Sequence, residues 1–185
     1  MAPHGRLGEV ATGRLGHFQG LYDQGSPIVL INPPADPSAH GLAYTGIETE
    51  HLLLVRAKTT PDQLWSAEQA LLAGTCAAVQ LWQKRPRTDA LRRFNLAARS
   101  STSLLFVMRH LSEARDASPA DLRIAVKPSE SGAAIEILKR KGPYFEGAIA
   151  LALTPTATLI SNRPRVRRGV TLYVEPSLTP EVEHS

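Results

Sequence analysis

Apolar residues follow two different patterns along the chain, and the change falls near Ala117. Before this point, four short apolar runs have the length and composition of strands that are buried on both faces. They are Ser26–Asn32, Leu52–Val55, Cys76–Trp82 and Ser103–Met108. Helical patterns fill two of the intervals, from Thr60 to Gly74 and from Arg87 to Ser100. The first part of the chain is therefore predicted to alternate strands and helices around a mostly parallel sheet.

The helix that starts near Thr60 carries signals at both ends. Pro61 suits the first helical position, and Gln63 stands three residues after Thr60, as in a capping box. Gly74 is a typical residue just after a helix end. The predicted apolar face consists of Leu64, Ala67, Leu71 and Leu72. A helix of this kind, followed directly by a buried strand, predicts the return half of a βαβ unit.

After Ala117 the apolar residues alternate with polar ones. Asp121–Lys127 and Ala133–Lys139 show this alternation on either side of a short polar turn, which predicts an antiparallel hairpin. A further apolar stretch covers Ala148–Leu153, and Val170–Val174 is either one more edge strand or a partner-binding segment. The predicted fold class is α/β: a mixed, mostly parallel sheet of about six or seven strands, flanked by helices and ending in an antiparallel hairpin.

Composition fits a folded domain of 185 residues, of which 43% are hydrophobic and 21% charged. No apolar run reaches the roughly 18 residues of a membrane span, and no secretory core opens the chain, so a cytoplasmic protein is expected. The formal net charge of +4 allows contact with nucleic acid without requiring it. Cys76, the single cysteine, lies in a predicted strand and is expected to be a buried, inert thiol.

Candidate chemistry along the chain is sparse. Gly8 and Gly13 have the spacing of a phosphate loop, but Arg14 and Leu15 replace its lysine and its hydroxyl residue, so this loop is degenerate. The strand that ends at Trp82 has no carboxylate after it for magnesium. The histidines show no metal-ligand spacing. No catalytic residue, cofactor or metal site is therefore predicted, and the chain is not expected to be an enzyme.

Basic residues form two groups that are candidates for contact with a partner or with DNA. Lys139, Arg140 and Lys141 follow the hairpin and are interpreted either as a solvated turn or as a phosphate or acidic-partner contact. The second group lies in a C-terminal segment of little periodicity and comprises Arg163, Arg165, Arg167 and Arg168. Trp65 and Trp82 are interpreted as packing residues, with Trp82 also a contact candidate because it ends a strand.

Five segments of the chain together resemble the ImuA family of RecA-like accessory proteins. These segments are LWSAEQALLAGTCAAVQLW (64–82), LRRFNLAAR (91–99), LLFVMR (104–109), LRIAVKP (122–128) and EILKRKGP (136–143). The run Leu64–Gly74 is the most specific of them. The resemblance implies a degenerate RecA-like domain over residues 1–155, shortened at its N-terminus, and a basic tail over residues 156–185.

The same resemblance implies that the ATPase positions of the fold have been replaced. The catalytic glutamate of active recombinases falls on Pro34, the magnesium-binding aspartate on Trp82, and the glutamine that senses the γ-phosphate near His110. The Walker lysine falls on Arg14. The expected function is therefore that of a non-catalytic scaffold of DNA-damage-induced (SOS) mutagenesis and translesion synthesis.

The implied partners are an ImuB-like inactive Y-family polymerase homologue, RecA and an error-prone replicative polymerase, with a weak DNA contact. Two alternatives stay open. One is a cell-division inhibitor of the SulA type that acts on FtsZ, a reading opposed by the extended hairpin. The other is a switch that retains nucleotide binding.

Overall fold

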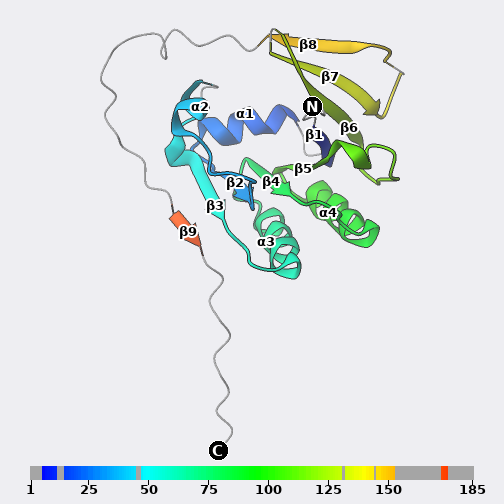
Figure 1. Cartoon of the computed structure of the whole chain (residues 1–185). Coiled ribbons are helices and arrows are strands. Elements are labelled where there is room, and N and C mark those ends of the chain that lie inside the picture. The colour runs from blue at the N-terminus through cyan, green and yellow to red at the C-terminus, as the bar shows by residue number, and fades with distance from the viewer. Residues whose placement is uncertain are drawn as a thin grey trace, which may run out of the picture.

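The computed structural model describes residues 6–11, 15–44, 47–130, 132–143, 145–152 and 172–174. A nine-stranded mixed sheet runs through them in the order β8-β7-β6-β1-β5-β4-β2-β3-β9 (Figure 1). The strands are β1 (Arg6–Ala11), β2 (Ile28–Ile31), β3 (Leu52–Val55), β4 (Ala78–Trp82), β5 (Leu104–His110), β6 (Leu122–Ser129), β7 (Gly132–Lys139), β8 (Ala148–Ala152) and β9 (Leu172–Val174).

Parallel pairing joins β5, β4, β2 and β3, as the four apolar runs predicted. All four residues of β2 are buried, which explains why its sequence does not alternate. The helices are α1 (Leu15–Asp23), α2 (Ala39–Tyr44), α3 (Thr60–Ala73) and α4 (Thr88–Ser100), with short 3₁₀ helices η1 (Thr49–His51) and η2 (Leu111–Glu113). Helices α3 and α4 lie on one side of these strands and α1 on the other (Figure 1).

Each face of the parallel strands has its own apolar core. Under α3 and α4, the core is built by strand residues such as Ile31, Leu81 and Leu105, and by Leu71 and Phe94 from the helices. On the opposite face, Ile28, Leu30, Leu54, Ala78 and Leu104 pack with Phe18 and Tyr22 of α1. Side chains of successive residues therefore enter opposite cores, as the strand period of two requires.

The α3 cap lies one residue earlier than the sequence predicts. Thr59 is the N-cap: its hydroxyl accepts a hydrogen bond from the Asp62 amide at 3.3 Å and donates one to the Asp62 carboxylate at 2.7 Å. The predicted Thr60–Gln63 box is therefore wrong: Thr60 is the first residue of the helix, and the hydroxyl that caps it belongs to the preceding residue. Gly74 ends the helix with φ of 63°, as expected, because glycine tolerates this left-handed conformation.

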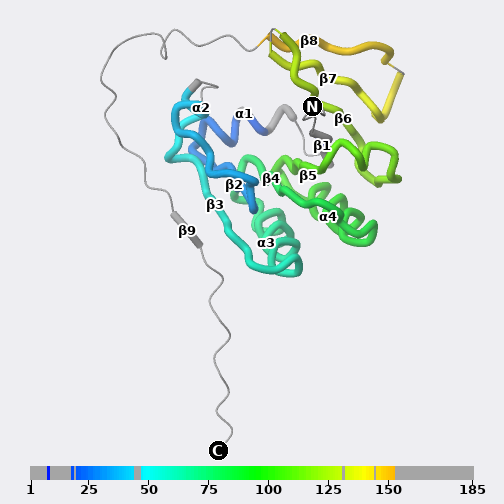
Figure 2. The backbone as a smooth tube through the Cα atoms, viewed as in Figure 1, coloured from blue at the N-terminus to red at the C-terminus, as the bar shows by residue number. Residues whose placement is uncertain are grey.

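The antiparallel half of the sheet is larger than predicted. The expected hairpin forms from β6 and β7, and β8 adds a third antiparallel strand that is exposed throughout. The early strand β1 was not predicted; it lies between β5 and β6 and runs antiparallel to both. In Figure 2, β6, β7 and β8 extend past the helices.

Three further findings concern the sequence-based organisation of the chain. The described strand β9 pairs in parallel with β3, which agrees with the edge-strand interpretation of Val170–Val174. The division of the chain at residue 155 and the RecA-like character of the core stay predictions. None of the described helices has the length and apolar character needed to cross a membrane.

A buried ionic cluster joins the two halves of the sheet. The Arg109 guanidinium on β5 contacts the Glu113 carboxylate at 2.7 and 2.8 Å, and both side chains are almost fully buried. Arg109 also pairs with Asp116 at 3.2 Å. On β6, the buried Arg123 donates to the backbone carbonyls of Asp116 at 2.8 Å and Glu113 at 3.3 Å. Strands β5 and β6, which flank β1, therefore both bind the segment that connects them.

The ionic cluster yields a stability prediction. Replacing Glu113 with Ala removes the buried carboxylate that lies closest to the buried Arg109 charge, so we expect a loss of about 3–5 kcal/mol in the free energy of unfolding. The double variant Arg109→Met/Glu113→Leu removes both charges and should recover most of that loss. Chemical denaturation measures both values.

A matched control for this prediction is Lys127→Ala, which breaks the half-exposed pair between Lys127 and Glu136. An exposed pair contributes little, so this variant should lose no more than about 1 kcal/mol. Equal losses for Lys127→Ala and Glu113→Ala would contradict the special role of the buried cluster.

Candidate functional site

The carboxyl edge of the parallel strands is where open α/β sheets usually bind their ligands. Here the loop after β2 is tied to the loop after β3. The Asn32 side chain accepts a hydrogen bond from the Ala57 amide and donates one to the Ala57 carbonyl, both at 2.7 Å. Asn32 has φ of 49°, a left-handed conformation that asparagine tolerates better than most residues. Arg56 also donates to the Pro33 carbonyl and pairs with Asp36.

Residues that follow β4 and β5 at this edge are likewise engaged in structural contacts. Trp82 is partly buried against the core on the α1 side, and the Gln83 amide donates to the Met108 carbonyl at 3.1 Å. Nδ1 of His110 contacts the Ser112 hydroxyl at 2.8 Å and accepts from the Ser112 amide at 3.2 Å, which caps η2. The polar groups named at this edge are thus used in hydrogen bonds within the chain.

The predicted degenerate phosphate loop begins at Gly8, which the structure places inside a strand and not in the loop after one. Gly8 lies inside β1, where an added Cβ would come within 3.2 Å of the Ile124 side chain. Because β1 is antiparallel to β5, its carboxyl end lies beside the start of β5, at the opposite edge from Asn32 and Gln83. Gly13 and Arg14 lie outside the described residues. Gly8 therefore serves close packing between β1 and β6.

The basic group after β7 is partly used in internal contacts. Lys139 donates to the Ser118 carbonyl, and Lys141 pairs with the buried Asp121 carboxylate, each at 2.8 Å. Arg140 is exposed. Lys139 and Lys141 thus connect the end of β7 to the segment before β6. The other basic group, with Arg163, Arg165, Arg167 and Arg168, lies outside the described residues.

Exposed apolar residues on the helical layer were not predicted. Trp65 is 58% exposed and Leu72 is 60% exposed, so both the packing interpretation of Trp65 and the assignment of Leu72 to the apolar face are wrong. The two residues are seven apart on α3 and share one face with the exposed Gln69. On α4, Leu96 is also exposed, between the exposed Arg92, Arg93 and Arg99.

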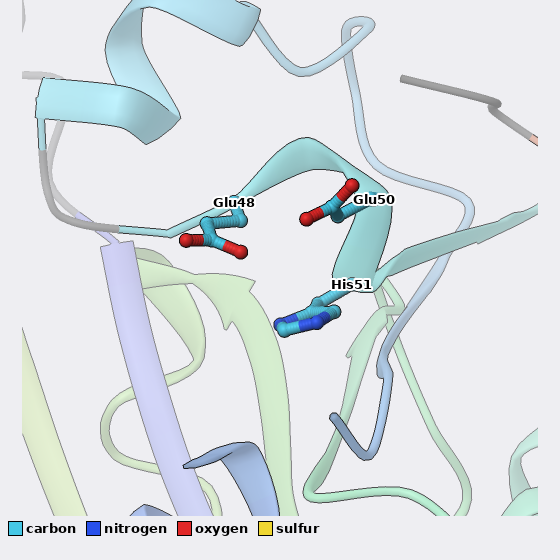
Figure 3. Close-up of side chains that lie close together, drawn as sticks. All are labelled: Glu48, Glu50 and His51. Carbon is cyan, nitrogen blue, oxygen red and sulfur yellow. The ribbon is translucent and has the colours of Figure 1, made fainter. Parts of the chain in front are cut away.

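A second group that sequence reasoning missed consists of Glu48, Glu50 and His51, whose side chains lie close together in Figure 3. Each offers a potential metal-ligand atom, and these atoms all lie within 4.8 Å of one another. The signal in the sequence was only a short Glu-x-Glu-His string, whose spacing is not specific to metal sites. Its geometry depends on η1, which brings the three side chains together ahead of β3.

Cys76 has no features of a reactive site. Its thiol is buried, donates to the Ala70 carbonyl at 3.2 Å and contacts the Ser103 hydroxyl at 3.5 Å. Burial raises the pKa of the Cys76 thiol above its ordinary value, although the Ser103 hydrogen bond acts in the opposite direction. The prediction of a buried thiol is confirmed.

This environment predicts slow thiol chemistry. Because burial disfavours the thiolate, we expect native Cys76 to react with a disulfide reagent at pH 8 at least about tenfold more slowly than in the unfolded chain. Raising the pH should increase the native rate, since a raised pKa leaves the thiol protonated until more alkaline pH. Reaction of the native protein at the unfolded rate would contradict this account.

Comparisons with known proteins leave the family open. No protein-family model matches the chain. No curated protein matches it either. Among solved structures, the chain is similar to the crystal structure of SulA from Pseudomonas aeruginosa, with 24% identity and a TM-score of 0.40. The match covers 53% of this chain and 92% of the SulA chain. At this TM-score the overlap assigns neither a fold family nor a function.

Proposed function

We propose that this protein is a non-catalytic scaffold that supports translesion synthesis after DNA damage by binding an ImuB-like partner. The pathway and the partner come from the sequence resemblance to the ImuA family. The structure supports the scaffold part of this proposal through one observation, the exposure of Trp65 and Leu72 on α3.

Trp65 and Leu72 lie in the run Leu64–Gly74, the segment most specific to the resemblance. Within that run, Ala67 and Leu71 are fully buried and anchor α3 on the sheet. Fold maintenance alone thus accounts for the buried residues but not for a tryptophan and a leucine in solvent. Large exposed apolar side chains are typical of protein-binding surfaces, and tryptophan is enriched among the residues that dominate binding energy.

The charge of the neighbouring helix indicates the chemistry of the partner. Helix α4 packs against α3 and exposes Arg92 and Arg93. Both arginines are exposed, so their charges are available to a docked chain. The partner segment that fits is apolar where it meets Trp65 and Leu72 and acidic where it meets α4.

The carboxyl edge of the sheet supports a scaffold rather than a phosphoryl-transfer enzyme. Phosphoryl transfer depends on positioned carboxylates, a metal ion and a phosphate cradle. At this edge the described chain instead places an amide, Asn32, in two backbone hydrogen bonds and the indole of Trp82 at the end of β4. These residues hold loops together and offer no group that polarises water.

The docking proposal is tested by Trp65→Ala and Leu72→Ala in binding measurements with the purified ImuB-like protein. We expect Trp65→Ala to weaken the affinity at least about tenfold, because truncation of a central tryptophan typically costs more than 1.4 kcal/mol. Leu72→Ala should weaken it less. Both side chains are exposed, so the free energy of unfolding should change little.

Phe145→Ala is the matched control, because Phe145 is an exposed aromatic residue in the connection between β7 and β8, two strands that lie away from α3 (Figure 1). It should bind the partner as the wild type does. Unchanged affinity in Trp65→Ala would remove α3 as the docking surface. Capture of FtsZ in place of the ImuB-like protein would replace the scaffold function with division inhibition.

Nucleotide binding provides an independent test. Because the loops at the carboxyl edge are tied together and β4 is followed by Gln83, we expect no saturable heat when ATP and magnesium are titrated into the protein. Isothermal titration calorimetry with ATP at up to about 1 mM probes the affinity range of weak nucleotide sites. Binding at micromolar concentration would contradict the scaffold proposal and support a nucleotide-dependent switch.

A further inference from the structure

The Glu48, Glu50 and His51 side chains lie close together at η1, just before β3. Glu48 directly precedes η1, and Glu50 and His51 belong to it. The tight 3₁₀ turn turns all three toward one another, so that a potential ligand atom of each lies within 4.8 Å of the other two (Figure 3). Both glutamates are exposed, whereas His51 is partly buried beneath them.

Helix α1 holds this cluster in position. The Tyr22 hydroxyl accepts a hydrogen bond from the Glu48 amide at 2.8 Å. The Tyr22 ring also contacts the His51 ring edge-to-face, with centroids 5.2 Å apart. One residue of α1 therefore fixes both the backbone at the start of the turn and the plane of the imidazole. Preorganised ligands of this kind lose less conformational freedom when an ion binds.

His51 has an unsatisfied polar atom. Its Nδ1 is buried and makes no hydrogen bond. Buried ring nitrogens are normally hydrogen-bonded or coordinated, because an unpaired polar atom away from water is unfavourable. Exposed glutamates often lie near each other without a ligand. The buried His51 nitrogen that makes no hydrogen bond distinguishes this cluster from such groups.

Among the residues that the structure describes, the two carboxylates form no ion pair with a basic side chain. The ion pairs found among the described residues do not include Glu48 or Glu50. Two negative charges at such a distance repel each other, and a bound cation reverses the sign of that interaction.

We propose that Glu48, Glu50 and His51 form a binding site for a divalent transition-metal ion, with Zn²⁺ the best-fitting class. Imidazole nitrogen and carboxylate oxygen are both zinc ligands, and catalytic zinc sites combine them, whereas magnesium and calcium prefer oxygen ligands alone. Three protein ligands leave the remaining coordination positions to water or to a partner side chain. A bound ion would join Glu48, whose amide is held by Tyr22 of α1, to Glu50 and His51, which directly precede β3.

Isothermal titration calorimetry, with zinc titrated into the full chain in a non-chelating buffer, tests this site. We expect one saturable site in the wild type that is weakened at least about tenfold by His51→Ala and by Glu48→Gln/Glu50→Gln. His40→Ala and Glu68→Gln are matched controls, because they remove the same chemical groups on α2 and α3 and should leave the affinity unchanged.

Thermal unfolding gives a second readout, since an ion that binds only the folded state raises the melting temperature. Zinc should raise it in the wild type and in both controls but not in Glu48→Gln/Glu50→Gln. The glutamine pair keeps the turn sterically intact, so it remains informative if His51→Ala disturbs packing against Tyr22. Absence of saturable binding in the wild type, or wild-type affinity in the glutamine pair, would overturn the site. Neither result bears on partner binding through α3.

Discussion

Two buried arginines control how the parallel and antiparallel halves of the sheet meet. Arg109 and Arg123 stand on the strands that flank β1, and both hold the segment around η2. A buried ion pair stabilises little compared with an apolar substitute, but it is intolerant of misplacement. A shifted β6 would separate Arg123 from the carbonyls that it binds. The cluster thus acts more on the alignment of the strands than on their total stability.

The sequence revealed those parts of the fold whose signals are local. Residues of β6 and β7 alternate visibly because they pair across a short turn, and Gly74 marks the end of α3 by its own conformational freedom. Helix α1 contains Gly16 and Gly20, which weaken the intrinsic helix tendency, so its existence depends on the packing of Phe18 and Tyr22 on the sheet. Such long-range packing leaves no periodic pattern.

The candidate sites show the same limit. Periodicity identifies apolar residues on α3, but whether Trp65 and Leu72 are covered depends on which elements pack nearby, and that is a property of the whole fold. Lys139 and Lys141 illustrate the reverse case: their sequence suggests a free basic turn, while Ser118 and Asp121 occupy both side chains. The string of Glu48, Glu50 and His51 gains meaning only when η1 and Tyr22 orient it.

The central position of β1 has a consequence for the order of folding. Strands β2 to β5 can pair as they leave the ribosome, whereas β1 must wait for both of its partners, since Arg6 pairs with His110 on one side and Val126 on the other. Contacts between such distant segments form slowly because a long loop must close first. The earliest strand of the chain is thus among the last to be placed. Until it inserts, the edges of β5 and β6 that it will cover remain open to other chains.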